Sequence, residues 1–339
     1  MEALGPPSPV PPPAARHGAA AGGARVVRVL PSTGQVRGGP GFPEVNGIAD
    51  GLGSVWVTGG DAGHSHVLYA VDPETGRVGA RIGLPSRLVI NPNDVATGSG
   101  AVWVAVGSAV YRVDPASASG GVVNRAFAAL PHGDLIGDVV VHAGAVWVTD
   151  TARGEVYRFA VSGGRLEAVV AVGTTAGAMA VGDGGIWVAD SDARTVSRIS
   201  VRHNRVGEVL TFPGAPGHIA ASGAGLWVTD GTGGVMMAPS GQPGRVLTVP
   251  VGGEPTGLAA SGNTVWVAST ADGTLSRIDT RRHVVVATVR VGARPYAVAA
   301  GQQGTWVALL GRPVTMQAPR RPSPAPGAGQ PWLLRLCGG

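Results

Sequence analysis

A tryptophan-centred motif recurs seven times along the chain and restricts its fold more than any other feature. The motif reads SVWVTG, AVWVAV, AVWVTD, GIWVAD, GLWVTD, TVWVAS and GTWVAL. Its tryptophans are spaced 47, 44, 40, 40, 39 and 40 residues apart, and they are Trp56, Trp103, Trp147, Trp187, Trp227, Trp266 and Trp306. A period of about 40 residues is typical of repeats that stack or close into a ring. Each period is therefore one structural unit.

The same four short segments recur in each period. A segment of small residues that ends near glycine precedes each tryptophan, as in GAMAVG and GHIAASG. The tryptophan segment follows and is apolar on both faces. After a polar turn comes an alternating segment, at residues 68–72, 110–114, 156–160, 196–200, 235–239 and 275–279. A Val-rich segment ends the unit and is clearest at residues 284–291.

Four short strands in about 40 residues, separated by turn residues, are the pattern of a propeller blade. Helical periodicity is absent from all of these segments. The sequence therefore predicts an all-β chain that forms a seven-bladed β-propeller of four-stranded antiparallel blades. Because one blade cannot bury both of its faces alone, closure of the ring is expected to make folding cooperative.

The two ends of the chain are expected to complete the last blade together. The segment WLLRL (332–336) matches a third strand, and RVVRVL (25–30) then fits the outer strand. The alternative is that RVVRVL itself is the third strand. Such a closure by N- and C-terminal strands removes an open sheet edge. Residues 1–23 are expected to be a disordered Pro/Ala/Gly-rich tail, residues 24–339 the propeller, and residues 313–331 a Pro-rich loop in its last blade.

Composition excludes several classes of protein. The single cysteine, Cys337, allows neither an intramolecular disulfide nor a cysteine-based metal cluster. The basic residues are all arginine and are scattered, with a net charge of +5, so no nucleic-acid partner is predicted. No apolar run is long enough for a membrane span, and the start lacks the apolar core of a signal peptide. A cytoplasmic monomer is expected, or an extracytoplasmic protein if the start is truncated.

Aligning the repeats on their tryptophans predicts which residues meet around the central channel, because residues at equal distance from the tryptophan lie at equal height. Nine positions before it, the ring reads Gly47, Asp94, Asp138, Ala178, His218, Gly257 and Ala297. Ten positions before it, the ring reads Asn46, Asn93, Gly137, Gly177, Gly217, Thr256 and Tyr296. Twelve positions before it, the ring reads Glu44, Asn91, Leu135, Thr175, Ala215, Glu254 and Arg294.

Most members of these rings are small, so the scaffold itself does not require the polar exceptions. We predict that a ligand-binding site at the channel mouth is formed by Asn46, Asn91, Asn93, Asp94, Asp138, His218, Glu254, Arg294 and Tyr296. The extra residues in the first two periods, between the strands of blades one and two, favour the side of the mouth formed by blades one to three.

Asp94 and Asp138 come from adjacent blades at one height. Two carboxylates with nearby amide oxygens could hold Ca²⁺ or Mg²⁺, or raise each other's pKa for acid–base work. Alternatively, each carboxylate caps backbone amides of a neighbouring turn. A salt bridge between blades is expected for Glu254 and Arg294.

A second candidate metal site lies after the first tryptophan motif. His64 and His66 alternate along the chain, so in a strand they share a face and could grip a metal ion, with Asp61 nearby. By contrast, the aspartates that end the VTD and VAD motifs recur in register. Recurrence favours a turn role, in which the carboxylate bonds backbone amides, for Asp150, Asp190 and Asp230.

The pattern IWVAD…VSRI…VGxxPxxIAxG resembles the YVTN-type and streptogramin-B-lyase-like seven-bladed propellers over residues 24–336. For the lyases, the resemblance implies a His after Pro in two successive blades, a Glu before the second Pro, and a Glu four residues after the next Trp. Glu254 matches this pattern. Thr256, Gly217 and Thr270 stand at the other three positions, with His218 one residue late.

These observations lead to one principal hypothesis and one alternative. The principal hypothesis is a non-catalytic binding or interaction module whose channel mouth takes an unknown small molecule or protein. The alternative is a metal-assisted lyase or hydrolase of the streptogramin-lyase-like type that acts at the same mouth.

Overall fold

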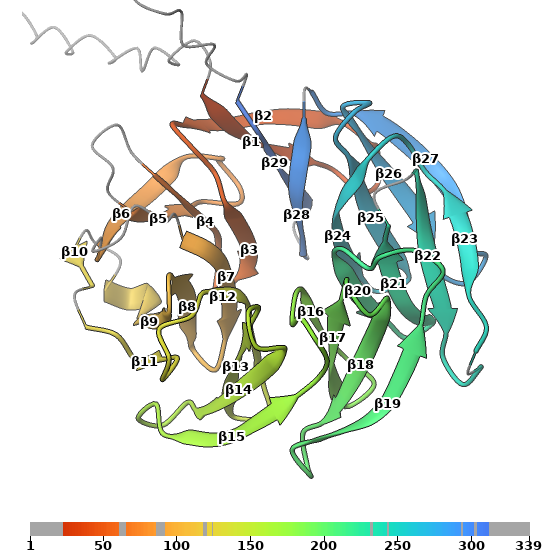
Figure 1. The fold of residues 1–339 in the computed structure, drawn as a ribbon. Coiled ribbons are helices and arrows are strands. Elements are labelled where there is room, and N and C mark those ends of the chain that lie inside the picture. Colours follow the sequence, from red (N-terminus) through yellow and green to blue (C-terminus); the bar gives the residue numbers. More distant parts are fainter. Residues whose placement is uncertain are drawn as a thin grey trace, which may run out of the picture.

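The computed structural model describes residues 23–60, 66–85, 92–117, 121–123, 125–230, 233–242, 244–292, 294–301 and 304–311 of the 339-residue chain. Within these ranges the strands form seven sheets around a central axis (Figure 1). The predicted seven-bladed, all-β propeller is confirmed. The described ranges contain a single helical element, the 3-10 turn η1 (Pro115–Ser117).

The blades are numbered 1 to 7 by their tryptophans in chain order. The innermost strands of blades 1 to 7 are β3 (Gly47–Gly51), β7 (Pro92–Gly98), β12 (Ile136–His142), β16 (Met179–Gly182), β20 (Ile219–Ser222), β24 (Pro255–Ser261) and β28 (Pro295–Gly301). The tryptophan strands are β4 (Ser54–Gly60), β8 (Ala101–Val106), β13 (Ala145–Asp150), β17 (Gly185–Asp190), β21 (Gly225–Thr229), β25 (Thr264–Ser269) and β29 (Gly304–Leu309).

The third strands are β5 (His66–Val71), β9 (Ala109–Val113), β14 (Glu155–Ala160), β18 (Thr195–Ser200), β22 (Gly234–Pro239), β26 (Thr274–Asp279) and β1 (Ala24–Val29). The outer strands are β6 (Val78–Leu84), β11 (Ala128–Ala129), β15 (Leu166–Ala171), β19 (Arg205–Thr211), β23 (Leu247–Pro250), β27 (Val284–Arg290) and β2 (Val36–Phe42). Strand β10 (Gly121–Val122), from the insertion in blade 2, pairs in parallel with β6 and covers the outer edge of blade 1.

Blade 7 is closed by two strands from each end of the described chain, in the order β2-β1-β29-β28 (Figure 1). β1 pairs along its length with β29, where Val27 lies opposite Val307. RVVRVL is therefore the third strand, and the prediction that residues 332–336 fill this place was wrong. The reason lies in the burial of β1, because Val26, Val27 and Val29 are at most 4% exposed. Residues on both faces of β1 are buried, as in a strand covered by two neighbouring blades. Residues 332–336 themselves lie outside the described ranges.

This closure predicts that truncating the two ends of the chain affects stability very differently. Ending the chain at Gly311 should change the melting temperature by less than about 2 °C, because all four strands of blade 7 lie within residues 24–309. Deleting residues 1–30 removes β1 and should abolish cooperative unfolding. Thermal denaturation followed by circular dichroism measures both. A large drop after the C-terminal truncation would assign residues 312–339 to the folded blade after all.

The core consists of apolar clusters between adjacent blades. Trp56 of blade 1 packs with Val102 and Val104 of blade 2. At the closure, Trp306 of blade 7 packs with Val55 and Val57 of blade 1. Burial of each such side chain stabilises the fold by roughly 2–3 kcal/mol. Since every cluster needs side chains from two blades, the ring is stable only as a whole.

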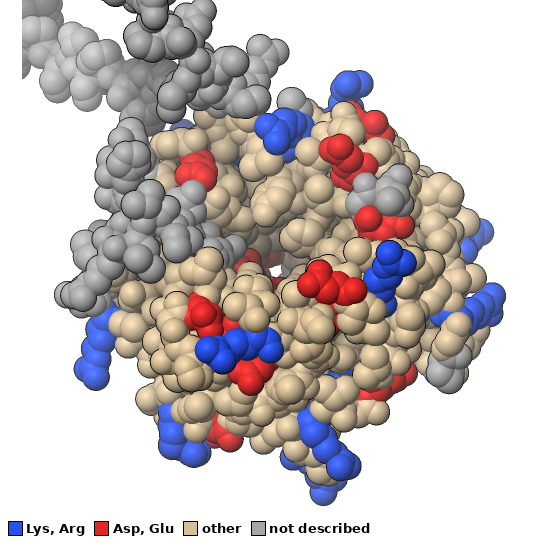
Figure 2. All heavy atoms as spheres, in the orientation of Figure 1, with Lys and Arg blue, Asp and Glu red and all other residues tan. Residues whose placement is uncertain are grey.

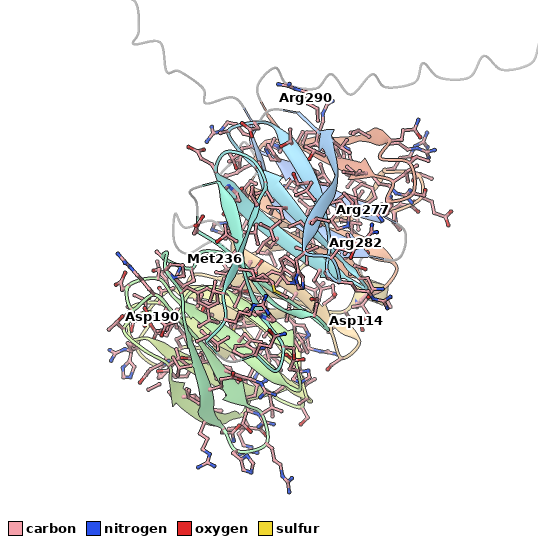
Figure 3. All side chains as sticks on the ribbon, turned by 90° about the vertical axis from the view of Figure 1, so that its right-hand side faces the viewer. Asp114, Asp190, Met236, Arg277, Arg282 and Arg290 are labelled. Atoms are coloured by element: carbon pink, nitrogen blue, oxygen red, sulfur yellow. The ribbon has the colours of Figure 1, made fainter. Side chains whose placement is uncertain are left out.

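The disc has two distinct faces, which Figure 3 shows from the side. Asp190, at the end of a tryptophan strand, lies on one of them, the mouth face, where the innermost strands begin. Asp114 and Arg282, which follow third strands, lie on the opposite face. Residues can therefore be assigned to a face from their place in the repeat.

Candidate functional site

The innermost strands begin around a cavity of about 640 Å³ on the propeller axis. It is lined by all seven residues that the repeat alignment places nine positions before the tryptophans: Gly47, Asp94, Asp138, Ala178, His218, Gly257 and Ala297. Figure 2 shows the opening at the centre of the mouth face, with acidic atoms in its depth. The cavity exists because four of these seven residues are glycine or alanine, which leave the channel unfilled.

Asp138 links blades 3 and 4 through its carboxylate and backbone. One carboxylate oxygen accepts the amide of Val139 at 2.6 Å, and the other accepts the amide of Met179 in blade 4 at 2.5 Å. The backbone amide of Asp138 donates to the Thr149 hydroxyl at 2.9 Å. Asp94 repeats this arrangement one blade earlier, because its carboxyl accepts amides of its own following residue and of Val139 in blade 3. The predicted capping of backbone amides is thus present in both aspartates.

Asp94 and Asp138 also form a hydrogen bond with each other. Burial raises the pKa of Asp94 well above its ordinary value, and the charge of Asp138 and the hydrogen bond to it add to the rise. Because two carboxylates in direct contact cannot both ionise easily, Asp94 holds its proton more tightly than a free aspartate does.

His218 and Tyr296 lie across the cavity from the carboxyl pair. Their rings meet at nearly a right angle, with centroids 6.3 Å apart. Gly257, from the blade between them, has no side chain to separate them, and a Cβ there would lie 2.5 Å from the Tyr296 carbonyl oxygen. The His218 side chain is reached by solvent through the channel, yet protein surrounds it on most sides. This burial lowers the pKa of His218, against the opposing charge of Asp138.

The pKa of the Tyr296 phenol is shifted by the same surroundings. Burial raises the pKa of Tyr296, and the charge of Asp94 adds to this. Asn46, which also lines the cavity, has a buried amide nitrogen with no hydrogen-bond partner. The cavity therefore presents an imidazole and a phenol whose neutral forms are favoured, a free amide donor and the carboxyl pair.

The other predicted site residues do not join this cluster. Glu254 and Arg294 are exposed, do not line the cavity, and have backbone φ angles of 53° each. No ion pair joins them in the described structure, so the predicted salt bridge was wrong. The reason is that each occupies a left-handed turn before the innermost strand, outside the channel wall.

Several predicted residues are only partly described or lie outside the described ranges. Asn93 belongs to β7, but its side chain is not described, and Asn91 lies outside the described residues. His64 and Asp61 are also outside them, whereas His66 begins β5 and is 3% exposed. The paired histidine metal site therefore stays a prediction. The same holds for the expected bias toward blades 1 to 3, because much of their inserted sequence is not described.

Two of the three recurring aspartates, Asp150 and Asp190, act in turns as predicted. Asp150 accepts the amides of Ala152 and Arg153, and Asp190 accepts those of Asp192 and Ala193. Sequence analysis missed two hydroxyls that line the cavity one residue further on, those of Thr151 and Ser191. Their signal was available, since both stand four residues after a tryptophan.

Comparisons with known proteins support the fold. No family model matches the chain, and no curated protein sequence matches it. Among solved structures, hydrazine synthase of Kuenenia stuttgartiensis is similar, with a TM-score of 0.66 and 14% identity. The match covers 78% of this chain and 92% of that chain. At this identity the likeness shows the propeller fold alone, and the resemblance to YVTN-type and streptogramin-lyase-like families is not confirmed.

At two of the positions where the resemblance to the lyases implies a His or a Glu, this chain has threonines that form local hydrogen bonds. The hydroxyls of Thr256 and Thr270 lie 2.7 Å apart, and that of Thr270 donates to the Pro295 carbonyl oxygen at 2.6 Å. Among the described residues, no group of three or more His, Cys, Asp or Glu side chains is placed to hold a metal ion. The possible Ca²⁺ or Mg²⁺ site at Asp94 and Asp138 stays a prediction. In the part of the chain that the structure describes, no helix has the length and apolarity needed to cross a membrane.

Proposed function

We propose that this protein is a binding module that holds a small polar molecule, neutral or positively charged, in its central cavity. The observation that carries the proposal is the cavity of about 640 Å³, lined at one height by residues from all seven blades. This size lies within the range of small-molecule sites. Its wall is mostly glycine, alanine and larger aliphatic side chains, while the polar groups converge on one space.

The chemistry of the lining favours this class of ligand. No arginine lines the cavity, so an anion would meet only the charge of the carboxyl pair. His218 offers an acceptor or a donor, Tyr296 a hydroxyl, and Asn46 a free amide N–H. An unsatisfied buried donor of this kind costs roughly 1–3 kcal/mol, which a ligand acceptor would recover.

Binding is favoured over catalysis by the hydrogen bonds of the carboxyl pair. Both oxygens of Asp138 already accept backbone amides, and Asp94 is bonded to Asp138 and to two further amides. Groups held in this way are fixed hydrogen-bonding partners. Transfer of the Asp94 proton to a substrate would remove the hydrogen bond between Asp94 in blade 2 and Asp138 in blade 3.

A thermal-shift experiment tests the proposal. The probes are glucose, myo-inositol and ethanolamine, with succinate as the anionic counterpart. We expect a rise in melting temperature with a neutral or cationic probe and none with succinate, because a ligand that binds only the folded state stabilises it. The shift should be lost in His218→Ala and Asp138→Asn, and kept in the matched surface variants His203→Ala and Asp192→Asn.

Three outcomes would count against this function. The first is a shift that survives both cavity variants, and the second is binding of succinate alone. The third is the absence of any shift together with the absence of a bound small molecule in native mass spectra of freshly purified protein. A shift with Ca²⁺ or Mg²⁺ that Asp138→Asn removes would instead favour the metal-dependent alternative.

A further inference from the structure

An arginine from the third strand lies over the tryptophan of its blade in five of the seven blades. The guanidinium carbons are 5.0 to 6.0 Å from the ring centroids. At three blade junctions this arginine also reaches the turn of the next blade, where it donates to a carbonyl oxygen. These contacts are Arg28 to Pro73 at 2.6 Å, Arg158 to Val201 at 2.9 Å and Arg277 to Pro31 at 2.9 Å.

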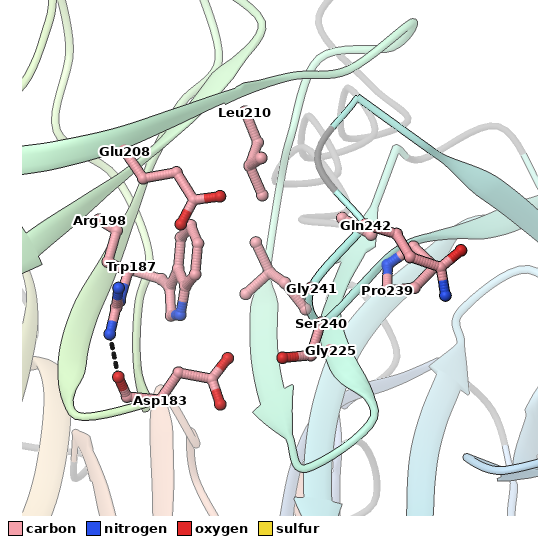
Figure 4. A pocket seen from close by; sticks show the side chains of 12 residues that line it. Asp183, Trp187, Arg198, Glu208, Leu210, Gly225, Pro239, Ser240, Gly241 and Gln242 are labelled. Carbon is pink, nitrogen blue, oxygen red and sulfur yellow. Dashed lines mark hydrogen bonds between the residues drawn. The ribbon is translucent and has the colours of Figure 1, made fainter.

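The junction of blades 4 and 5 departs from this pattern. Arg198 donates to the carbonyl oxygen of Asp183 in its own blade instead of crossing to blade 5. A pocket of about 450 Å³ opens there, between Trp187 and Arg198 on one side and Pro239 to Gln242 on the other (Figure 4). Its turns belong to the opposite face of the disc, so this pocket is separate from the central cavity.

Two buried nitrogen donors at this pocket have no hydrogen-bond partner. They are Nε1 of Trp187, whose residue is only 4% exposed, and Nε of Arg198. In three other blades the indole N–H donates to a carbonyl oxygen five residues earlier, as it does from Trp147 to His142 at 3.2 Å. A buried N–H without a partner costs roughly 1–3 kcal/mol. Two such donors beside one pocket point to an acceptor group that binds there.

The charges of the pocket are also unpaired. Asp183 and Glu208 both line it, and neither forms an ion pair with Arg198 in the described structure. In blade 3, by contrast, Arg158 lies 3.0 Å from Glu167. Figure 4 shows the Glu208 and Asp183 carboxylates on two sides of the indole. The pocket therefore offers one cation and two carboxylates to whatever enters it.

The corresponding hollow between blades 6 and 7 provides an internal comparison. It has a volume of about 430 Å³ and is lined by Trp266, Arg277 and Arg290, but by no acidic side chain. Arg277 spans it and is bonded to the next blade. Of these two junctions, only the one between blades 4 and 5 combines free donors with free carboxylates.

We propose that the pocket between blades 4 and 5 binds a small zwitterion, a free α-amino acid. Its carboxylate accepts hydrogen bonds from Nε1 of Trp187 and Nε of Arg198. Its ammonium group is attracted by Glu208 and Asp183. A molecule that carries only one of the two charges leaves one side of the pocket without a partner, and this is the basis of the expected selectivity.

Calorimetric titration of the full chain with L-alanine and L-lysine tests the proposal. Propionate and ethylamine are the probes that lack one charge. We expect saturable binding of at least one amino acid, and binding weaker by about 10-fold or more for propionate and ethylamine. Trp187→Phe removes the indole donor and keeps an aromatic ring, so it should weaken binding by about 10-fold. Trp147→Phe, whose indole nitrogen is bonded to His142, is its matched control.

Glu208→Gln provides a second test that does not disturb the core, because Glu208 is only half-buried on an outer strand. It should weaken binding of the amino acid and leave that of propionate unchanged, whereas Glu167→Gln in blade 3 should behave as the wild type. Circular dichroism establishes that each variant is folded. If Trp187→Phe does not fold, Glu208→Gln alone decides. The proposal is overturned if neither amino acid binds, if propionate or ethylamine binds equally well, or if the folded pocket variants bind like their controls.

Discussion

Replacing Asp190 with alanine is expected to destabilise the propeller by about 3 kcal/mol or more, the largest effect we expect from a single polar side chain. Asp190 is 1% exposed, and its carboxylate fastens the segment that enters blade 4. It accepts the Thr174 amide at 2.7 Å and the Thr175 hydroxyl at 2.9 Å. It also accepts the amides of Asp192 and Ala193 in its own turn. Alanine would remove the acceptor of all these partly buried hydrogen bonds at once.

The pKa of Asp190 reflects the same contacts. Burial alone would raise it, but the hydrogen bonds from Ala193, Thr174 and Thr175 outweigh burial and lower the pKa below its ordinary value. Because the folded pKa is lowered, the stabilisation is present above the ordinary carboxyl pKa of 3.8. It is lost as the pH falls through the lowered folded pKa. The variant should therefore be less sensitive to acid than the wild type.

Asp150, at the same position one blade earlier, is the matched control. Where Asp190 has the two threonines, Asp150 has Asp134 and Leu135. One oxygen of Asp150 has no hydrogen-bond partner and lies 3.9 Å from Nε of Arg153. Burial and the charge of Asp134 raise the pKa of Asp150, although the backbone amide of Arg153 opposes them.

Asp150→Asn should therefore change the stability at pH 7 by less than about 1 kcal/mol, since asparagine keeps the bonded oxygen and removes a poorly compensated charge. Urea unfolding of both variants at pH 7 gives the comparison. Equal losses of stability in the two variants would show that the threonine contacts do not distinguish the two turns.

The repeat explains why so much of the fold could be predicted. Seven tryptophan strands of one type require one architecture, and the predicted strand ranges differ from the observed ones by at most two residues, as for residues 68–72 and β5. The closure of blade 7 was less certain from sequence because RVVRVL and WLLRL both fit a third strand. Only the pairing of β1 with β29, which joins distant parts of the chain, distinguishes them.

The two candidate sites also differ in how far the sequence predicts them. Repeat alignment places Asp94, Asp138 and His218 at one height, because that depends on backbone position alone. The pocket between blades 4 and 5 could not be found by alignment, since TVSRIS and TLSRID are nearly identical. Yet Arg198 turns back to its own blade, whereas Arg277 crosses to the next one. The direction of a long side chain depends on the neighbouring blade, because Arg277 meets the carbonyl oxygen of Pro31 there, whereas Arg198 faces the turn at Ser240 and Gly241 without bonding to it.

The second large effect concerns the pH dependence of stability, of which Asp94→Asn is expected to remove one component. The folded-state pKa of Asp94 is raised, so the folded protein binds the Asp94 proton more tightly than the unfolded chain does. The corresponding stabilisation is complete below the ordinary carboxyl pKa of 3.8 and is lost as the pH rises through the raised folded value. Wild-type stability should therefore fall with rising pH across this window.

Asparagine imitates the protonated carboxyl without titrating. Its amide nitrogen can donate to Asp138, and its oxygen can accept the backbone amide of Val139. We expect the variant to lose this component of the pH dependence and to exceed the wild type in stability by about 1 kcal/mol or more at pH 8. Urea unfolding between pH 4 and about pH 8 measures both effects.

Asp192→Asn, at an exposed residue, is the matched control. It should keep the wild-type dependence of stability on pH if the carboxyl pair causes that dependence. A wild-type slope in Asp94→Asn would mean that Asp94 holds no additional proton in the folded protein. The cavity would then be more negatively charged. Such a cavity would favour a divalent cation over a neutral molecule, so this measurement also discriminates between the two ligand classes considered for the channel mouth.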